Sequence, residues 1–267
     1  GVNEMNLKTV YFTKHRNYTN PKKIKPQGIM IHDTGADNPN LKRYVQPNVY
    51  GIGENAYNNH WNKASQVECA HVFIGALDDG TIASINVMPF TYRTYHCGDS
   101  ANNTHISIEI CRDINDETYF NKVYKELIEV CSYICLLYGL DPSQDGVVIC
   151  HAEGYQRGIA SNHADVTEWF PKYGYDMNRV RTDIINNKTG GIFMENFEEQ
   201  YKEYIKTLQD NDAGEWSKEA REWAISNGLV SGSGTLETGE PNYMWESPLT
   251  REQFYQVLYR LHLQGKL

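Results

Sequence analysis

The sequence lacks the features of membrane-spanning and nucleic-acid-binding proteins. Its longest apolar stretch, residues 130–140, is too short for a bilayer, which takes about 20 residues. The N-terminus has no apolar signal segment. The formal net charge is −9, and no basic run interrupts the chain, which argues against a nucleic-acid partner. We therefore expect no membrane span and no nucleic-acid partner.

Cys-x-x-Cys pairs are also absent. The six cysteines all lie in the first 150 residues, several of them inside apolar runs or on one face of a predicted helix: Cys69, Cys97, Cys111, Cys131, Cys135 and Cys150. This distribution predicts buried free thiols and folding in a reducing cytoplasm. A secreted chain whose signal peptide has been removed would look the same.

Several catalytic signatures are missing. No His-Glu-x-x-His helix or Walker loop is present, and no Gly-x-Gly-x-x-Gly follows a strand. His151-Ala152-Glu153 matches half of the zinc-deaminase signature, but the required downstream Pro-Cys-x-x-Cys is absent. These absences argue against the corresponding metalloprotease, nucleotide-binding and deaminase chemistries.

Two histidines and an aspartate form the candidate metal site. His32 closes the apolar run 28–31 and His151 closes the run 147–150, so each is expected at the end of a buried strand. Asp165 follows soon after His151. Two imidazoles and a carboxylate with one open position are the ligand set of a catalytic zinc. The alternative is two strand-end histidines and an aspartate that caps the next helix.

Further short motifs follow in order along the chain. They are Ile31-His32-Asp33-Thr34-Gly35, Ala70-His71-Val72-Phe73-Ile74, Asp79-Gly80-Thr81-Ile82, Tyr95-His96-Cys97-Gly98, Asn102, Ile106-Ser107-Ile108-Glu109 and His151. In this order and spacing, residues 25–170 resemble the zinc-dependent N-acetylmuramoyl-L-alanine amidases of the amidase-2 type. That family includes phage endolysins and is related to peptidoglycan recognition proteins.

The resemblance implies zinc (Zn²⁺) bound by His32, His151 and Asp165. Many members have a Lys two residues before the last ligand, where this chain has His163, and some have a Tyr where it has Ala70. Proton transfer then falls to Glu109 on the predicted strand 106–111, where it shares one face with the small residues Ser107 and Cys111. The alternative for Glu109 is an outward-facing carboxylate.

Other polar residues are assigned to catalysis or substrate binding. His163 would stabilise the oxyanion if protonated or in the correct tautomer; a supporting or merely solvated role is the alternative. His96, in a loop beside Gly98, and Asn102 are expected to contact substrate. His71 is expected either to contact substrate or to be a core histidine with its hydrogen bonds satisfied.

The predicted fold is α/β, a mixed central sheet flanked by helices, plus a small all-α C-terminal module. A hairpin around residues 78–80 implies antiparallel pairing, and Thr118 is expected to cap a helix that ends at Gly139. The predicted domains are a catalytic domain at 1–192, a charged helix (193–208) and linker within 193–213, and a module at 214–267.

The C-terminal module reads as a helix, a glycine-rich loop and a helix. Ser217 is expected to cap the first helix, and Thr250-Arg251-Glu252-Gln253 forms a capping box for the second. Trp223 is expected in its core and Trp245 in an exposed loop. The module resembles a single S-layer-homology-like repeat, which implies binding to secondary cell-wall polymer. One small copy also makes oligomerisation or docking onto the catalytic domain plausible.

The resemblance implies hydrolysis of the amide between N-acetylmuramic acid and L-alanine in peptidoglycan, with lysis of the wall. Synthesis in a bacterial cytoplasm and release through a holin or host lysis are expected. The alternative is a catalytically silent peptidoglycan-binding protein of the recognition-protein type. The complete ligand set with Glu109 favours the enzyme, because a pure binder has no need of an open zinc position.

Overall fold

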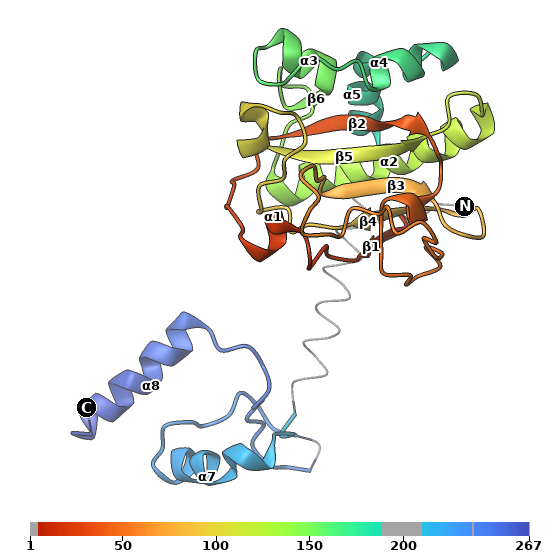
Figure 1. Cartoon of the computed structure of the whole chain (residues 1–267). Coiled ribbons are helices and arrows are strands. Elements are labelled where there is room, and N and C mark those ends of the chain that lie inside the picture. Colours follow the sequence, from red (N-terminus) through yellow and green to blue (C-terminus); the bar gives the residue numbers. More distant parts are fainter. Residues whose placement is uncertain (1–4, 188–209, 237, 267) are drawn as a thin grey trace. The chain divides into compact units, whose positions relative to one another are not determined.

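The structure is a computed structural model that describes residues 5–187, 210–236 and 238–266. It divides into two compact units, Gly1–Met194 and Glu195–Leu267 (Figure 1). The charged helix predicted over residues 193–208 lies outside the described residues. Each unit is described by itself.

The first unit is built on a six-stranded mixed sheet, as predicted from the sequence. The strand order is β1-β4-β3-β5-β2-β6, with β3 and β4 antiparallel and the other neighbours parallel. The strands are β1 (Leu7–Thr9), β2 (Gly28–Asp37), β3 (Val72–Ala76), β4 (Ile82–Asn86), β5 (His105–Arg112) and β6 (Val148–Cys150). The turn that joins β3 to β4 contains the predicted residues 78–80.

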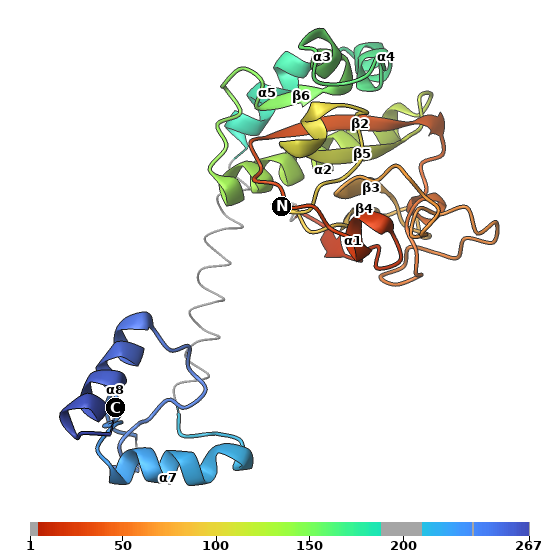
Figure 2. The same cartoon turned by 60° about the vertical axis from the view of Figure 1, so that its left-hand side comes forward.

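Helices α2, α4 and α5 pack against one face of this sheet, and α2 runs along it (Figures 1 and 2). The helices of the unit are α1 (Arg16–Thr19), α2 (Glu117–Tyr138), α3 (His151–Gln156), α4 (Val166–Trp169) and α5 (Met177–Asn186), with 3-10 turns η1 (Leu41–Arg43), η2 (Ser100–Asn103) and η3 (Phe170–Tyr173). Alternate strand side chains, such as Ile31 and Ile108, pack against α2. Their neighbours His32 and Glu109 therefore point to the opposite face.

Helix α2 begins two residues earlier than the sequence prediction. Asp116 is the N-cap, and its side chain accepts a hydrogen bond from the Tyr119 backbone N–H. The prediction of Thr118 was wrong because an aspartate that can reach the third N–H of the helix lies upstream. The predicted end at Gly139 is confirmed: this glycine has φ 63° and its N–H bonds back to the last turn.

Strand β2 is longer than the apolar run 28–31 from which it was predicted. It continues past His32 to Asp37, with a shift of register against β5 between Asp33 and Asp37. Arg112, at the end of β5, donates from Nε to Asp37 Oδ1 (3.0 Å) and from its backbone N–H to Thr34 Oγ1 (3.1 Å). These contacts hold polar residues in the strand beyond His32, where the sequence predicted that the strand would end.

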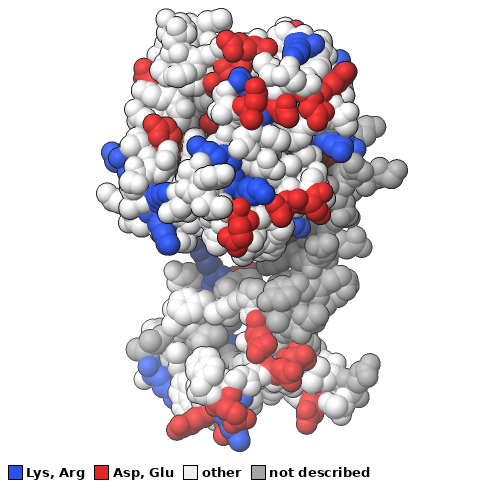
Figure 3. All heavy atoms as spheres, turned by 45° about the vertical axis from the view of Figure 1, so that its right-hand side comes forward, with Lys and Arg blue, Asp and Glu red and all other residues white. Residues whose placement is uncertain are grey.

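The predicted buried free thiols are confirmed, since all six cysteines are free and buried. No helix in the described ranges combines the length and apolar character that a bilayer crossing needs. Acidic and basic side chains lie intermixed on the described surface drawn in Figure 3.

The second unit contains η4 (Glu215–Ser217), α7 (Lys218–Ser226) and α8 (Arg251–Leu263). The predicted capping box of α8 is confirmed, with Thr250 Oγ1 accepting from the Gln253 N–H and Gln253 Oε1 from the Thr250 N–H. Ser217 precedes α7 but its side chain makes no capping bond, because Ser217 Oγ donates to the Gly214 carbonyl. The prediction of a core Trp223 was wrong, as its side chain is 50% exposed.

Candidate active site

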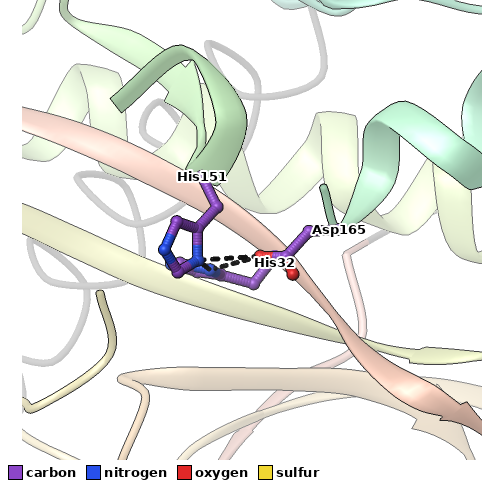
Figure 4. Close-up of side chains that lie close together, drawn as sticks. All are labelled: His32, His151 and Asp165. Atoms are coloured by element: carbon purple, nitrogen blue, oxygen red, sulfur yellow. Dashed lines mark hydrogen bonds and ion pairs between the residues drawn. The ribbon is translucent and has the colours of Figure 1, made fainter. Parts of the chain in front are cut away.

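Three elements bring His32, His151 and Asp165 together (Figure 4). His32 lies on β2, and His151 is the first residue of α3, directly after the neighbouring parallel strand β6. Asp165 precedes α4 with a left-handed backbone, φ 46°. Its side chain makes no capping bond to α4 and turns to the two histidines instead. Asp165 is therefore not simply a residue that caps α4.

One atom of each side chain converges on a common point. His32 Nδ1 and His151 Nδ1 are 3.1 Å apart, and Asp165 Oδ2 lies 2.8 and 3.0 Å from them, respectively. Ligands of a tetrahedral zinc, bound at about 2.0–2.2 Å, stand roughly 3.3 Å apart. Two imidazole nitrogens and a carboxylate oxygen are ligand types that zinc accepts. The donor set and its spacing therefore fit one zinc ion.

Burial favours the neutral form of His32, and hydrogen bonding favours the ionised form of Asp165. Burial lowers the pKa of His32, which favours the neutral imidazole. For Asp165, burial acts to raise the pKa, but the hydrogen bonds from His151 and His32 outweigh it and lower the pKa. A neutral imidazole and an ionised carboxylate are the ligand forms.

Glu109 lies beside the candidate metal site. It pairs with His32 in the register of β5 and β2, on the same face of the sheet, and is 9% exposed. Among the described residues, its Oε2 has no hydrogen-bond partner. Burial raises the pKa of Glu109 well above the usual range, and the negative charges of Asp165 and Asp33 add to this effect. Glu109 is thus a buried, proton-binding carboxyl group on the His32 face of the sheet, which excludes the outward-facing alternative.

His163 and His96 lie next to the two histidines of the candidate metal site. The exposed His163 ring lies 4.9 Å from the His151 ring, centroid to centroid. His96 Nδ1 lies 3.0 Å from His32 Nε2, with the two rings edge to face. The structure therefore places both residues at the candidate metal site. His163 lies on the solvent-exposed side of this site.

The other two substrate candidates are fully buried. His71 Nδ1 accepts from the Ser107 N–H (3.0 Å), and its Nε2 lies 2.7 Å from the Tyr92 carbonyl. Burial lowers the pKa of His71 to about 4. Asn102 Oδ1 accepts from the backbone N–H groups of His96 (2.8 Å) and Cys97 (3.0 Å). His71 is thus a core histidine with satisfied hydrogen bonds, and Asn102 holds the 96–97 loop.

The sequence analysis missed two residues that support this region. Ser161 Oγ lies 3.2 Å from His151 Nε2, and Arg181 forms a two-pronged ion pair with Glu153 on α3, 3.1 Å at each prong. Both contacts join residues that are more than two helical turns apart in the sequence, so no local pattern indicates them. Glu153 is engaged by Arg181 and caps α3 through the Cys150 N–H.

Comparison with known sequences identifies the protein family of this chain. The profile of the family described as N-acetylmuramoyl-L-alanine amidase matches residues 22–172, more than half of the chain. The chain belongs to the N-acetylmuramoyl-L-alanine amidase family. The matched range includes the three candidate metal ligands and Glu109. No curated protein matches the sequence.

Solved structures with the amidase fold resemble the chain at low sequence identity. The crystal structure of the Staphylococcus aureus hydrolase AmiA with its ligand has 19% identity and a TM-score of 0.50, covering 73% of this chain and 87% of that one. PlyL has 19% identity and a TM-score of 0.46, covering 68% and 97%. A mutant endolysin from Bacillus subtilis has 17% identity and a TM-score of 0.47, covering 67% and 99%. At this identity, the likeness to AmiA shows the fold alone.

Proposed function

We propose that this amidase-family chain hydrolyses the amide bond between N-acetylmuramic acid and L-alanine in bacterial peptidoglycan, and thereby lyses the cell wall. The convergence of His32 Nδ1, His151 Nδ1 and Asp165 Oδ2 beside the unpaired Glu109 carboxylate carries the proposal. An amide is a poor electrophile, so its hydrolysis needs both an activated water and stabilisation of the oxyanion.

The three convergent atoms would hold a zinc ion. Zinc bound there supplies a Lewis acid that polarises the scissile carbonyl and activates water near neutral pH. The buried His32 contributes a neutral imidazole, and Asp165 contributes a negative charge that offsets the charge of the ion. His151 is fixed at the start of α3, so two of the three ligands sit on rigid elements.

Glu109 is the proposed general base and acid. Its Oε2 takes the proton of the attacking water and returns it to the leaving amide nitrogen. Burial raises the pKa of Glu109, which makes its carboxylate a stronger base for the proton of the attacking water. His163, exposed beside the His151 ring, is the proposed second donor to the oxyanion.

A silent binding protein of the recognition-protein type remains the alternative outcome. A pure binder would gain nothing from a buried carboxylate whose Oε2 lacks a partner, since such a group costs stability. Glu109 therefore favours catalysis over binding alone.

The C-terminal unit is proposed to bind the wall through secondary cell-wall polymer or to self-associate. In its described residues, only Leu229 is a buried apolar residue, while Trp216 is 92% exposed. Exposed aromatic side chains of this kind suit either a carbohydrate ligand or a partner copy. We further propose that the chain is made in a bacterial cytoplasm and reaches the wall after holin-dependent or host-lysis release.

Metal analysis tests the zinc site. The wild-type chain should bind one zinc per molecule, chelation should abolish lysis, and added zinc should restore it. His151→Ala should lose most of the bound zinc, because one of three ligands is gone. His262→Ala, at an exposed position of α8, is the matched control and should keep full zinc. Full zinc occupancy in His151→Ala would remove the assignment.

A further inference from the structure

The outer nitrogen of each proposed zinc-binding imidazole has a partner of its own. His32 Nδ1 and His151 Nδ1 face the candidate metal position, so their Nε2 atoms point away from it. His32 Nε2 lies 3.0 Å from His96 Nδ1, and His151 Nε2 lies 3.2 Å from Ser161 Oγ. A metal-binding histidine donates its second N–H to such a partner, which fixes its tautomer and the orientation of its ring.

The position of each proton follows from these contacts. With Nδ1 directed at a metal, His32 carries its proton on Nε2 and donates it to His96 Nδ1. His96 is then an acceptor at Nδ1 and carries its own proton on Nε2, a buried atom with no hydrogen-bond partner among the described residues. Ser161 Oγ accepts from His151 Nε2 and donates its hydroxyl proton to the Cys97 carbonyl, 3.0 Å away. Each of these three hydrogen bonds therefore has one donor and one acceptor.

One loop holds both partners in place. The Cys97 carbonyl accepts from the Ser161 backbone N–H (2.8 Å) as well as from Ser161 Oγ. The fully buried Asn102 accepts at Oδ1 from the N–H groups of His96 and Cys97. The loop from His96 to Asn102 therefore fixes the acceptor for His32 and the acceptor for His151 together.

We propose that His96, Ser161 and Asn102 form a positioning clamp that orients His32 and His151 for zinc. The inference rests on the proposed function, since it takes His32 and His151 as zinc ligands. It reassigns His96 and Asn102, which the sequence suggested as substrate contacts, to positioning residues. Ligands held in this way bind metal tightly because little side-chain freedom is lost on binding.

Zinc affinity, measured by competition with a chelator, tests the clamp. His96→Ala and Ser161→Ala should each weaken zinc binding, by roughly 10–100-fold for a lost outer partner. His96→Asn should restore part of the affinity, because its Oδ1 can take the place of His96 Nδ1 as acceptor. Ser132→Ala removes a buried serine, whose Oγ donates to the Ile128 carbonyl in α2, and should leave zinc affinity unchanged.

The possible outcomes distinguish a failure of the proposed clamp from a failure of the proposed function. If the wild-type chain binds no zinc, the proposed function fails, and the clamp fails with it. If the wild-type chain binds zinc and His96→Ala and Ser161→Ala bind it equally tightly, the clamp alone is wrong. An increase in KM in His96→Ala with unchanged zinc affinity would return His96 to substrate binding. The thermal stability of each zinc-free variant shows whether lost affinity reflects unfolding.

Discussion

At the scale of single residues, the chemistry depends on Glu109 as a proton carrier. Glu109→Gln should keep the fold and the zinc but lose turnover by a factor on the order of 10² or more, because an amide cannot accept the proton. The measurement is kcat on a soluble muropeptide. His163→Ala should lose less if its role is only supporting.

The matched control is Glu126→Gln. Glu126 is another buried glutamate with a raised pKa, but it lies on α2, where its Oε1 accepts from the Asn6 N–H and the Ser84 hydroxyl. Its loss should leave kcat almost unchanged. Near-normal turnover in Glu109→Gln would move the base role to another residue, and Glu153 is a poor substitute because Arg181 engages it.

His71 should make stability depend on pH. Its pKa is lowered from 6.5 to about 4 because burial disfavours the charged imidazole. Between these values the unfolded chain binds a proton that the folded chain does not. The free energy of unfolding should therefore rise with pH from about 4 to about 6.5, by up to about 3 kcal/mol from this residue.

Urea unfolding of the chelated protein across this range measures the effect without the pH dependence of zinc binding. His71→Gln should give a shallower rise of stability with pH, because the titrating group is gone. An unchanged slope in this variant would show that His71 does not titrate between pH 4 and 6.5.

At the scale of elements, the sequence predicted those features whose causes are local. The apolar face of α2, its end at Gly139 and the capping box of α8 follow from residues within one or two turns. The mixed sheet follows from apolar runs and the turn at 78–80.

Features that depend on remote partners could not be read from the sequence. The continuation of β2 past His32 depends on Arg112 from another strand. The burial of His71 with its bonds satisfied depends on Ser107 and Tyr92. The candidate metal ligands were predicted from the two apolar runs that His32 and His151 close and from the family resemblance, whereas the contact of Ser161 with His151 has no sequence signal.

The anchoring of α5 to α3 gives a prediction about stability. Arg181 binds Glu153 with two prongs and also donates to the Val148 carbonyl (2.9 Å), and both side chains are mostly covered. Arg181→Gln should lower the free energy of unfolding by about 1–3 kcal/mol, a range typical of hydrogen bonds to charged groups. Chemical denaturation measures this loss.

Arg157→Gln is the control for Arg181→Gln. Arg157 also makes a two-pronged ion pair, but its partner Asp145 is 84% exposed, so solvent screens the interaction. Its loss should cost less than that of Arg181. Equal losses in the two variants would show that the covered position of the Arg181 pair adds nothing.

At the scale of the whole molecule, amide hydrolysis by the first unit should be separable from wall binding by the second unit. The candidate catalytic residues lie within the first compact unit, whose main core is closed by residues of α2 and α5. A fragment that ends near residue 210 should therefore fold and cleave a soluble muropeptide at the rate of the full chain. On intact walls it should act more slowly, because a tethered binding unit raises the local concentration of enzyme.

Sedimentation of the isolated tail, from Gly214 onward, with purified walls checks the targeting role. Pelleting with walls supports targeting. A tail that stays in the supernatant and forms a stable oligomer would contradict it and would make the unit an assembly module. The exposed apolar side chains of α8, Phe254, Tyr255, Tyr259 and Leu263, would then pack against a partner copy.

The most direct test of the central claim is product analysis of peptidoglycan digested by the zinc-loaded chain. The account predicts new free L-alanine amino termini without new reducing sugar ends, and no products after chelation. New reducing ends without free L-alanine would indicate a glycosidase, and the absence of both from the zinc-loaded chain would indicate a binding protein. Either result would contradict zinc-dependent amide hydrolysis at His32, His151 and Asp165.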